Sequence, residues 1–112
     1  MNKVNSIQQF KAFYAELSTL VGKVLEMNEG ELLTSEVVAK FETRLSALER
    51  RRANTTALFG IRQMLPNLYE LAKPESHDLG NVTDEGLRRR IDQTILLIST
   101  LQASIRLLDL NP

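Results

Sequence analysis

LRRRIDQTILLISTLQASIRLL, residues 87–108, decides the fold of this 112-residue chain. Its apolar side chains recur at alternating steps of four and three residues, the spacing that places one face of an α-helix against other helices. The residues in register, here called the seam, are Leu87, Ile91, Thr94, Ile98, Leu101, Ile105 and Leu108. The stretch therefore predicts a long helix over about 84–109 that packs against other helices.

Another helix is predicted over about 5–28, where the apolar residues again recur at helical spacing. They are Phe10, Phe13, Leu17, Leu20, Val24 and Met27. Asn28 and Gly30 can take the left-handed conformation that ends helices, and Thr34 or Ser35 can cap the next helix. Because the connection is short, we expect these two helices to be antiparallel neighbours.

The middle of the chain leaves two alternatives open. An apolar stripe is interrupted at residues 49–56, ERRRANTT, and resumes at Leu58. One long helix over 35–72 is favoured, because no Gly or Pro lies in the interruption and Arg and Ala are good helix formers. The alternative is a break near 52–56 that gives four helices instead of three. Pro66 removes one backbone hydrogen bond, so we expect a kink near it.

Residues 73–83, KPESHDLGNVT, change in composition to Pro, Gly, Ser, Asn and Asp. They are predicted to form the longest loop and a mobile one. The length of the chain fits a single helical domain over 1–112. We therefore predict an all-α fold, an antiparallel bundle of three long helices or of four.

The composition argues against several classes of function. Fourteen Lys and Arg balance fourteen Asp and Glu, so the chain lacks the long-range positive field that nonspecific nucleic-acid binders use. No apolar run is long enough to span a membrane, and the first residues contain no apolar leader segment. There is no Cys, which points weakly to a reducing compartment. We expect a cytoplasmic protein that binds no membrane and for which nucleic acid is not the default partner.

No group of residues predicts catalysis. His77 is the only histidine and lies in the loop, where we expect it to be exposed and inactive. With no Cys and no second His, a zinc site would have to rely on carboxylates. Neither a glycine-rich phosphate loop nor a nucleophile with a base at a recognisable spacing is present. We expect no enzyme activity, no metal and no cofactor.

Two arginine triplets are the most conspicuous polar features. In the triplet at 88–90, Arg88 and Arg89 each follow an acid by four residues, the favourable order for ion pairs on a helix. The triplet at 50–52 has less support, since only Glu49 precedes Arg52 at helical spacing. It has either a structural role or recognises an acidic partner.

The predicted fold also places these triplets. If the first two helices fold back on each other, Arg52 comes opposite Phe10 and Tyr14, where its guanidinium could stack on a ring. The two triplets would lie far apart along the bundle, which disfavours a single DNA-binding patch.

Apolar residues cover more than one side of the last predicted helix, because Ile95, Leu96, Leu97 and Leu107 surround the seam. A chain of this length has few layers in which to bury them all. We expect part of this surface to meet another chain, either a copy of itself or a client helix. The alternative is a compact bundle that buries everything. The candidate partner-binding residues are Ile91, Ile95, Ile98, Leu101, Ile105 and Leu108, together with Arg50, Arg51 and Arg52.

These features favour a noncatalytic interaction protein, such as a small helical adaptor, chaperone or regulatory subunit that forms a homo-oligomer. In architecture the chain is similar to the small all-helical chaperones and adaptors of bacterial secretion systems, which hold an amphipathic client helix in a groove. The alternative is a small nucleic-acid-associated regulator that uses the two arginine triplets.

Overall fold

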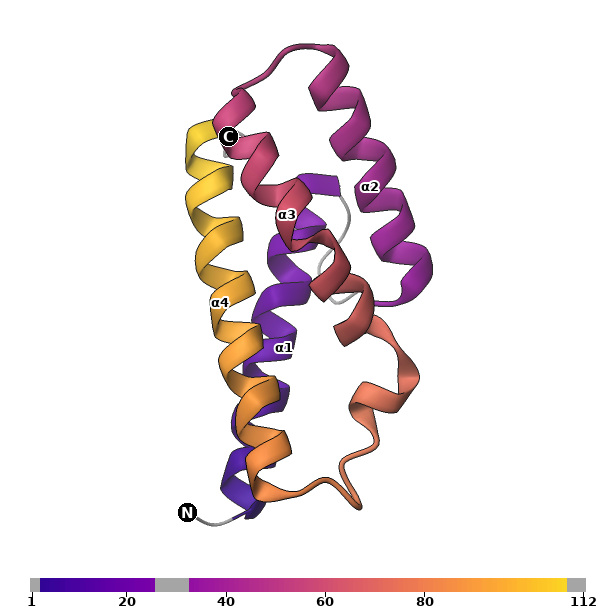
Figure 1. Ribbon diagram of the computed structural model, residues 1–112, viewed down its shortest axis with the longest axis vertical. Coiled ribbons are helices and arrows are strands. Elements are labelled where there is room, and N and C mark those ends of the chain that lie inside the picture. Colours follow the sequence, from indigo (N-terminus) through magenta and orange to yellow (C-terminus); the bar gives the residue numbers. More distant parts are fainter. Residues whose placement is uncertain (1–2, 26–32, 109–112) are drawn as a thin grey trace.

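Four α-helices follow the apolar stripes of the sequence. The computed structural model describes residues 3–25 and 33–108. It contains α1 (Lys3–Leu25), α2 (Ser35–Arg50), α3 (Thr55–Ala72) and α4 (Asp84–Leu108), with a short 3₁₀ helix, η1 (Pro74–His77), before α4 (Figure 1). The described residues contain no strand. The predicted all-α helical bundle is confirmed.

The single helix favoured over 35–72 is not observed, and the alternative break near 52–56 is correct. Helix α2 ends in a Schellman motif, in which the N–H of Ala53 donates to Leu48 O and the N–H of Arg52 donates to Glu49 O. Arg52 has a φ of 55°, the left-handed conformation that this motif requires. Asn54 then caps α3 by accepting the N–H of Ala57 at 3.0 Å. The turn lets the apolar side of α3 pack against α2. The stability gained from this packing outweighs the local preference of the sequence for a continuous helix.

The helices do not all alternate in direction. Arg62 of α3 contacts Glu49 and Tyr69 contacts Glu42, so α2 and α3 are antiparallel. Gly60 lies beside Ser104, and α3 and α4 are antiparallel too (Figure 1).

Helices α1 and α2, however, run in the same direction, which corrects the predicted antiparallel pair. The Tyr14 hydroxyl donates to Leu33 O, and Arg44 Nε donates to Val24 O at 3.3 Å. Residue numbers increase in the same direction on both sides, from Tyr14 and Leu33 to Val24 and Arg44, as in a parallel pair. The start of α2 therefore lies beside the middle of α1. A short connection between helices does not by itself impose an antiparallel pair.

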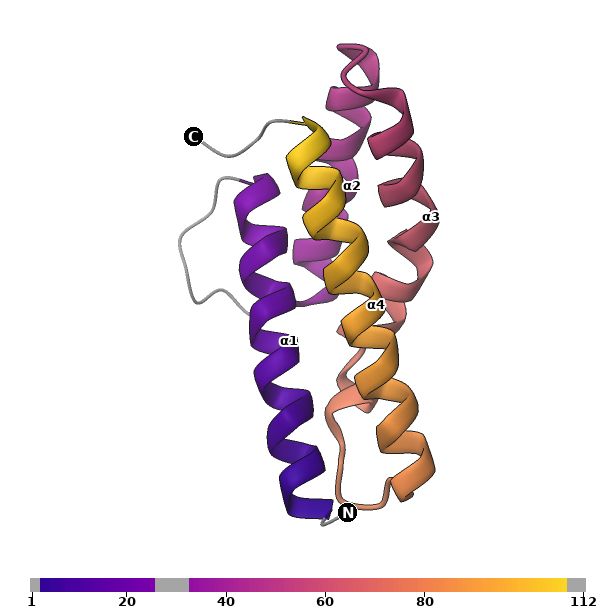
Figure 2. The same cartoon turned by 90° about the vertical axis from the view of Figure 1, so that its left-hand side faces the viewer.

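Helix α4 packs along α1 on one side and α3 on the other (Figure 2), and α2 packs against α3 and α1. Buried apolar side chains from all four helices form one cluster. The largest fully buried ones include Phe10, Leu17, Phe41, Leu45, Ile61, Leu68, Leu87 and Leu101. Each contributes roughly 1.5–3 kcal/mol by leaving water, which makes this cluster the main source of stability.

Pro66 lies inside α3, which continues to Ala72, so the proline does not end the helix. The kink expected there stays a prediction. The loop predicted over 73–83 contains η1, whose Ser76 carbonyl accepts a hydrogen bond from Arg90 at 3.2 Å. This contact ties the connection to α4, and its predicted mobility stays untested.

Candidate protein-interaction surface

Most of the seam lies inside the chain. Leu101 is fully buried, and Ile91, Ile98 and Ile105 are buried with it against the neighbouring helices. Leu108 is half-buried, and Ile95 is 39% exposed. The four buried residues pack the core of this chain, so the surface available to a partner must lie elsewhere on α4.

That surface is on the outer side of α4 and continues onto α3. Leu96 is 63% exposed and Leu107 54%, and Phe59 on α3 is 66% exposed. On α4, residues 96, 100, 103 and 107 follow one another at steps of four and three residues and therefore share one side of the helix. We call this surface the uncharged face and define it by Phe59, Gln63, Leu96, Thr100, Ala103 and Leu107.

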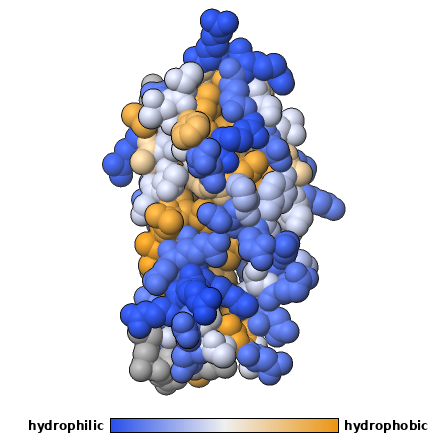
Figure 3. All heavy atoms as spheres, in the orientation of Figure 1, coloured by the Kyte–Doolittle hydropathy of each residue, from blue (hydrophilic) through white to orange (hydrophobic). Residues whose placement is uncertain are grey.

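Charges are missing from a long part of both helices. No charged residue lies between Asp92 and Arg106 on α4. Between Thr55 and Asn67, α3 carries only Arg62, which points towards α2. Figure 3 shows this side of the molecule, where hydrophobic side chains appear between hydrophilic ones over α3 and α4. In a chain with 25% charged residues, this surface is a candidate contact site.

The two helices of the face meet through small side chains. A Cβ added at Gly60 would lie 3.8 Å from Ser104 Oγ, an ordinary van der Waals contact. No bulky side chain separates the helices at this level, so α3 and α4 approach each other closely here.

The α2–α3 turn places three positive charges at one end of this face. Arg50 ends α2, Arg51 is its C-cap and Arg52 follows in the left-handed conformation. All three side chains are exposed, and they make no ion pair with any described residue. We call Arg50, Arg51 and Arg52 the arginine tip. It lies at the end of the molecule where α2 and α3 are joined (Figure 1).

A polar network between α2 and α3 explains why the tip has no acid. Arg62 of α3 binds Glu49 through both Nε, at 3.3 Å, and Nη2. Its Nη1 lies 3.5 Å from Glu42, whose other oxygen accepts the Tyr69 hydroxyl at 2.7 Å. The hydrogen bond to Glu49 raises the pKa of Arg62, and the hydrogen bond to Glu42 raises the pKa of Tyr69. Glu49 is thus held on α3 and is not available to Arg52.

The second arginine triplet is placed differently. Arg89 lies 3.5 Å from Glu85, the i,i+4 pair that the sequence predicted, and Arg90 donates to Ser76 O. This triplet begins α4, at the opposite end of the molecule from the tip (Figure 1). The two triplets do not form one basic patch.

His77, instead of Arg52, packs against the two rings at the start of α1. Its ring lies 4.4 Å from that of Tyr14, edge to face, and 6.0 Å from that of Phe10. Its Nε2 is 3.0 Å from Leu71 O. Burial raises the pKa of Tyr14 to about 12. His77 is exposed, as expected, and its ring contacts join η1 to α1. Arg52 does not reach these rings, because α1 and α2 are parallel and Arg52 lies at the tip.

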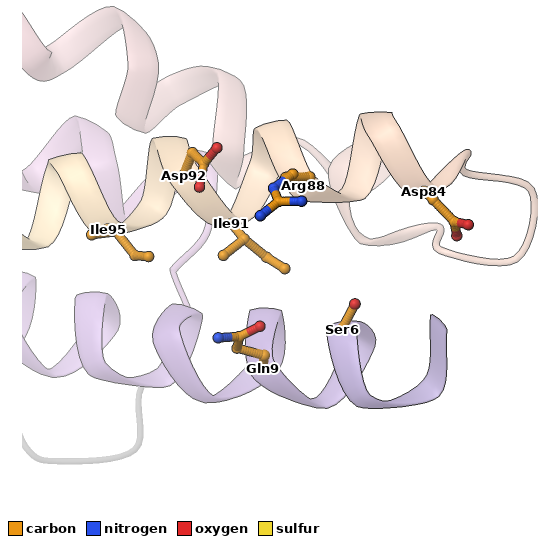
Figure 4. Close-up of a pocket in the computed structure, with 7 residues that line it drawn as sticks. All are labelled: Ser6, Gln9, Asp84, Arg88, Ile91, Asp92 and Ile95. Atoms are coloured by element: carbon orange, nitrogen blue, oxygen red, sulfur yellow. The ribbon is translucent and has the colours of Figure 1, made fainter. Parts of the chain in front are cut away.

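An open cavity of about 340 Å³ separates the first halves of α1 and α4. Figure 4 shows Arg88, Asp84 and Asp92 on α4, with Ser6 and Gln9 on the facing side of α1. One guanidinium between two carboxylates favours neither a cation nor an anion. Within 3–25 and 33–108, no three His, Cys, Asp or Glu side chains are grouped as metal ligands would be.

The sequence analysis did not identify Phe59, which directly follows Leu58, where the apolar stripe resumes. The buried positions of α3 include Leu58, Ile61, Leu65 and Leu68. Phe59 falls between these steps, almost opposite the core. Its phase relative to Leu58 and Ile61 was the signal that could have identified it.

No model of a known protein family matches this sequence, and comparisons with curated proteins and with solved structures found no match either. No helix in the described part of the chain is long and apolar enough to cross a membrane.

Proposed function

We propose that this chain is a noncatalytic protein–protein interaction module, of the adaptor, chaperone or regulatory-subunit kind, that binds a partner through the uncharged face. The observation that carries the proposal is the exposure of Phe59, Leu96 and Leu107 on a surface that holds no charge. Folded proteins seldom expose apolar side chains together on such a surface unless it contacts another molecule.

The apolar contacts are large enough to matter for affinity. Covering what remains exposed of the three side chains contributes roughly 1–2 kcal/mol each, in proportion to the area removed from water. The total of about 3–6 kcal/mol changes a dissociation constant by about two to four orders of magnitude. The interaction should therefore depend on these residues and not on the buried seam.

The test is a triple variant, Phe59→Ala, Leu96→Ala and Leu107→Ala, expressed with an affinity tag in the native host. Alanine keeps the helices intact because it has the highest helix propensity. Val4→Ala, which removes an exposed apolar side chain from α1, is the matched control. We expect proteins that co-purify with the wild type and the control to be lost from the triple variant. Co-purification of the same proteins with all three would contradict the proposal.

The alternative, a nucleic-acid-associated regulator, has less support, since the two arginine triplets lie at opposite ends and Arg89 is paired with Glu85. Binding to DNA at low salt that weakens steeply as salt rises would favour it. Self-association and a cytoplasmic location stay predictions from the sequence, and the first can be tested by light scattering over a range of concentrations.

A further inference from the structure

The arginine tip carries three positive charges that no described residue neutralises. Glu49, the nearest acid in the sequence, is bound by Arg62 on α3. Arg50, Arg51 and Arg52 are exposed and form no ion pair within the described part of the chain. Their guanidinium groups present forked N–H donors, which match the two oxygens of a carboxylate.

The backbone at Arg52 gives a second, independent reason to look for a role of its side chain. Arg52 occupies the position of the Schellman motif that glycine usually fills, and its φ is 55°. An arginine is strained in this conformation, where glycine would be relaxed. The geometry of the turn favours glycine and does not explain why an arginine stands here. Contact of its side chain with an acidic group would explain it.

The tip leads directly into the uncharged face. Phe59 lies one helical turn after Thr55, the first residue of α3. Leu107 lies 11 residues after Leu96 on α4, a separation of about 16 Å along the helix axis. The apolar surface is thus about three helical turns long, with a positive charge cluster at one end.

We propose that the uncharged face and the arginine tip together bind an amphipathic helix of a partner protein. The apolar side of that helix lies along α3 and α4, and its end beside the α2–α3 turn carries Asp or Glu. This inference rests on the proposed function and specifies the chemistry of the partner.

The distribution of charge favours a different protein over a second copy of this chain. Two copies aligned in parallel, face to face, would bring their two arginine tips together. Two antiparallel copies would bring each tip to the start of α4, where the second arginine triplet lies. On α4 that end carries Asp84, Glu85 and Asp92 together with Arg88, Arg89 and Arg90, so its acids are balanced by equal positive charge. Neither arrangement sets the tip against a net negative charge on α4.

Photo-crosslinking of the full chain in its native host tests this proposal. A benzophenone amino acid replaces Phe59, near the tip, or Leu96, at the far end of the face. Each position is combined with Arg50→Gln, Arg51→Gln and Arg52→Gln, or with the matched control Lys11→Gln, Lys23→Gln and Lys40→Gln. The control removes three exposed positive charges from α1 and α2 instead of from the tip. Circular dichroism checks that both triple variants fold.

We expect adducts at both positions, and we expect their yield to fall about tenfold in the arginine variant alone, because three close charge pairs are lost. Mass spectrometry should place the adduct of Phe59 within about one helical turn of the partner's acidic residues. The adduct of Leu96 should lie farther from them.

The other outcomes separate the two proposals. Adducts that persist in the arginine variant, or that join a segment without acidic residues, would overturn the acidic helix and leave the proposed function standing. Adducts between two copies of this chain would overturn the inference in favour of self-association. No adduct from either position would overturn both proposals.

Discussion

The inner and outer sides of α4 carry the same residue type in opposite surroundings. Leu101, on the inner side, is fully buried, whereas Leu96, five residues earlier, is 63% exposed. The difference lies only in their phase on the helix, which turns by about 100° per residue. A leucine in phase with the seam stabilises the fold, whereas a leucine out of phase stays exposed on the surface.

The largest difference in stability should appear when the same substitution, Leu to Ala, is made on the inner and on the outer side of α4. Leu101→Ala should lower the free energy of unfolding by about 2–5 kcal/mol, because it leaves a cavity in a packed core, and Leu101→Asp should abolish folding. Leu96→Ala should change it by less than about 0.5 kcal/mol. Urea denaturation followed by circular dichroism measures both. Equal effects of the two alanine variants would contradict the assignment of inner and outer sides.

A half-buried polar contact between α1 and the start of α2, made by Tyr14, should give a smaller effect that depends on pH. Burial raises the pKa of Tyr14 to about 12, above its ordinary value near 10. The folded state therefore favours the neutral phenol, and the contribution to stability is complete below about pH 10 and lost as the pH rises towards 12. We expect the wild type to lose more stability between pH 9 and pH 11.5 than Tyr14→Phe in urea denaturation. Parallel curves would show that Tyr14 is not buried.

Two arginines differ in the same way as the two leucines. Arg62 forms ion pairs with Glu42 and Glu49, whereas Arg51 forms none with the described residues. Arg62→Ala should lower the free energy of unfolding by roughly 0.5–1 kcal/mol, a modest value because these ion pairs are partly exposed to solvent. Arg51→Ala should leave it unchanged. Thermal unfolding of both variants tests this expectation, and a larger loss for Arg51→Ala would mean that the tip has a structural role.

A substitution at Arg52 should increase stability by a similarly small amount. Arg52→Gly removes the strain of a left-handed arginine, which is roughly 1–2 kcal/mol. Glycine also increases the conformational entropy of the unfolded chain, which lowers the free energy of unfolding by about 0.4–1 kcal/mol. We expect a net stabilisation of about 0.5–1 kcal/mol and weaker binding of the partner. Arg52→Lys, which keeps both the charge and the strain, is the control. If Arg52→Gly destabilises the protein, the side chain of Arg52 has a structural role that the fold does not reveal.

The sequence was sufficient to predict the buried part of α4, since Ile91, Ile98, Leu101 and Ile105 are all in register and all buried. It could not resolve the turn at 51–54. The signal there is an arginine in a conformation that glycine prefers, and local propensity favours continuing the helix.

The direction of α2 and the surface were also beyond the sequence pattern. Tyr14 binding Leu33 shows that α2 starts beside the middle of α1, a choice made by tertiary packing. The surplus of apolar residues on the last helix was recognised through Leu96 and Leu107. Phe59 is one of several apolar residues in α3, and only its angular position relative to Leu58 and Ile61 separates it from the buried ones.

The central claim is that the outer side of α3 and α4 is the working surface of this protein. The most direct measurement is a titration of the ¹⁵N-labelled chain with its purified partner, followed by amide chemical shifts in NMR spectra. We expect the largest shifts at Phe59, Gln63, Leu96, Thr100 and Leu107 and at the arginine tip. Shifts confined to α1 and the exposed side of α2, with these amides unchanged, would contradict it.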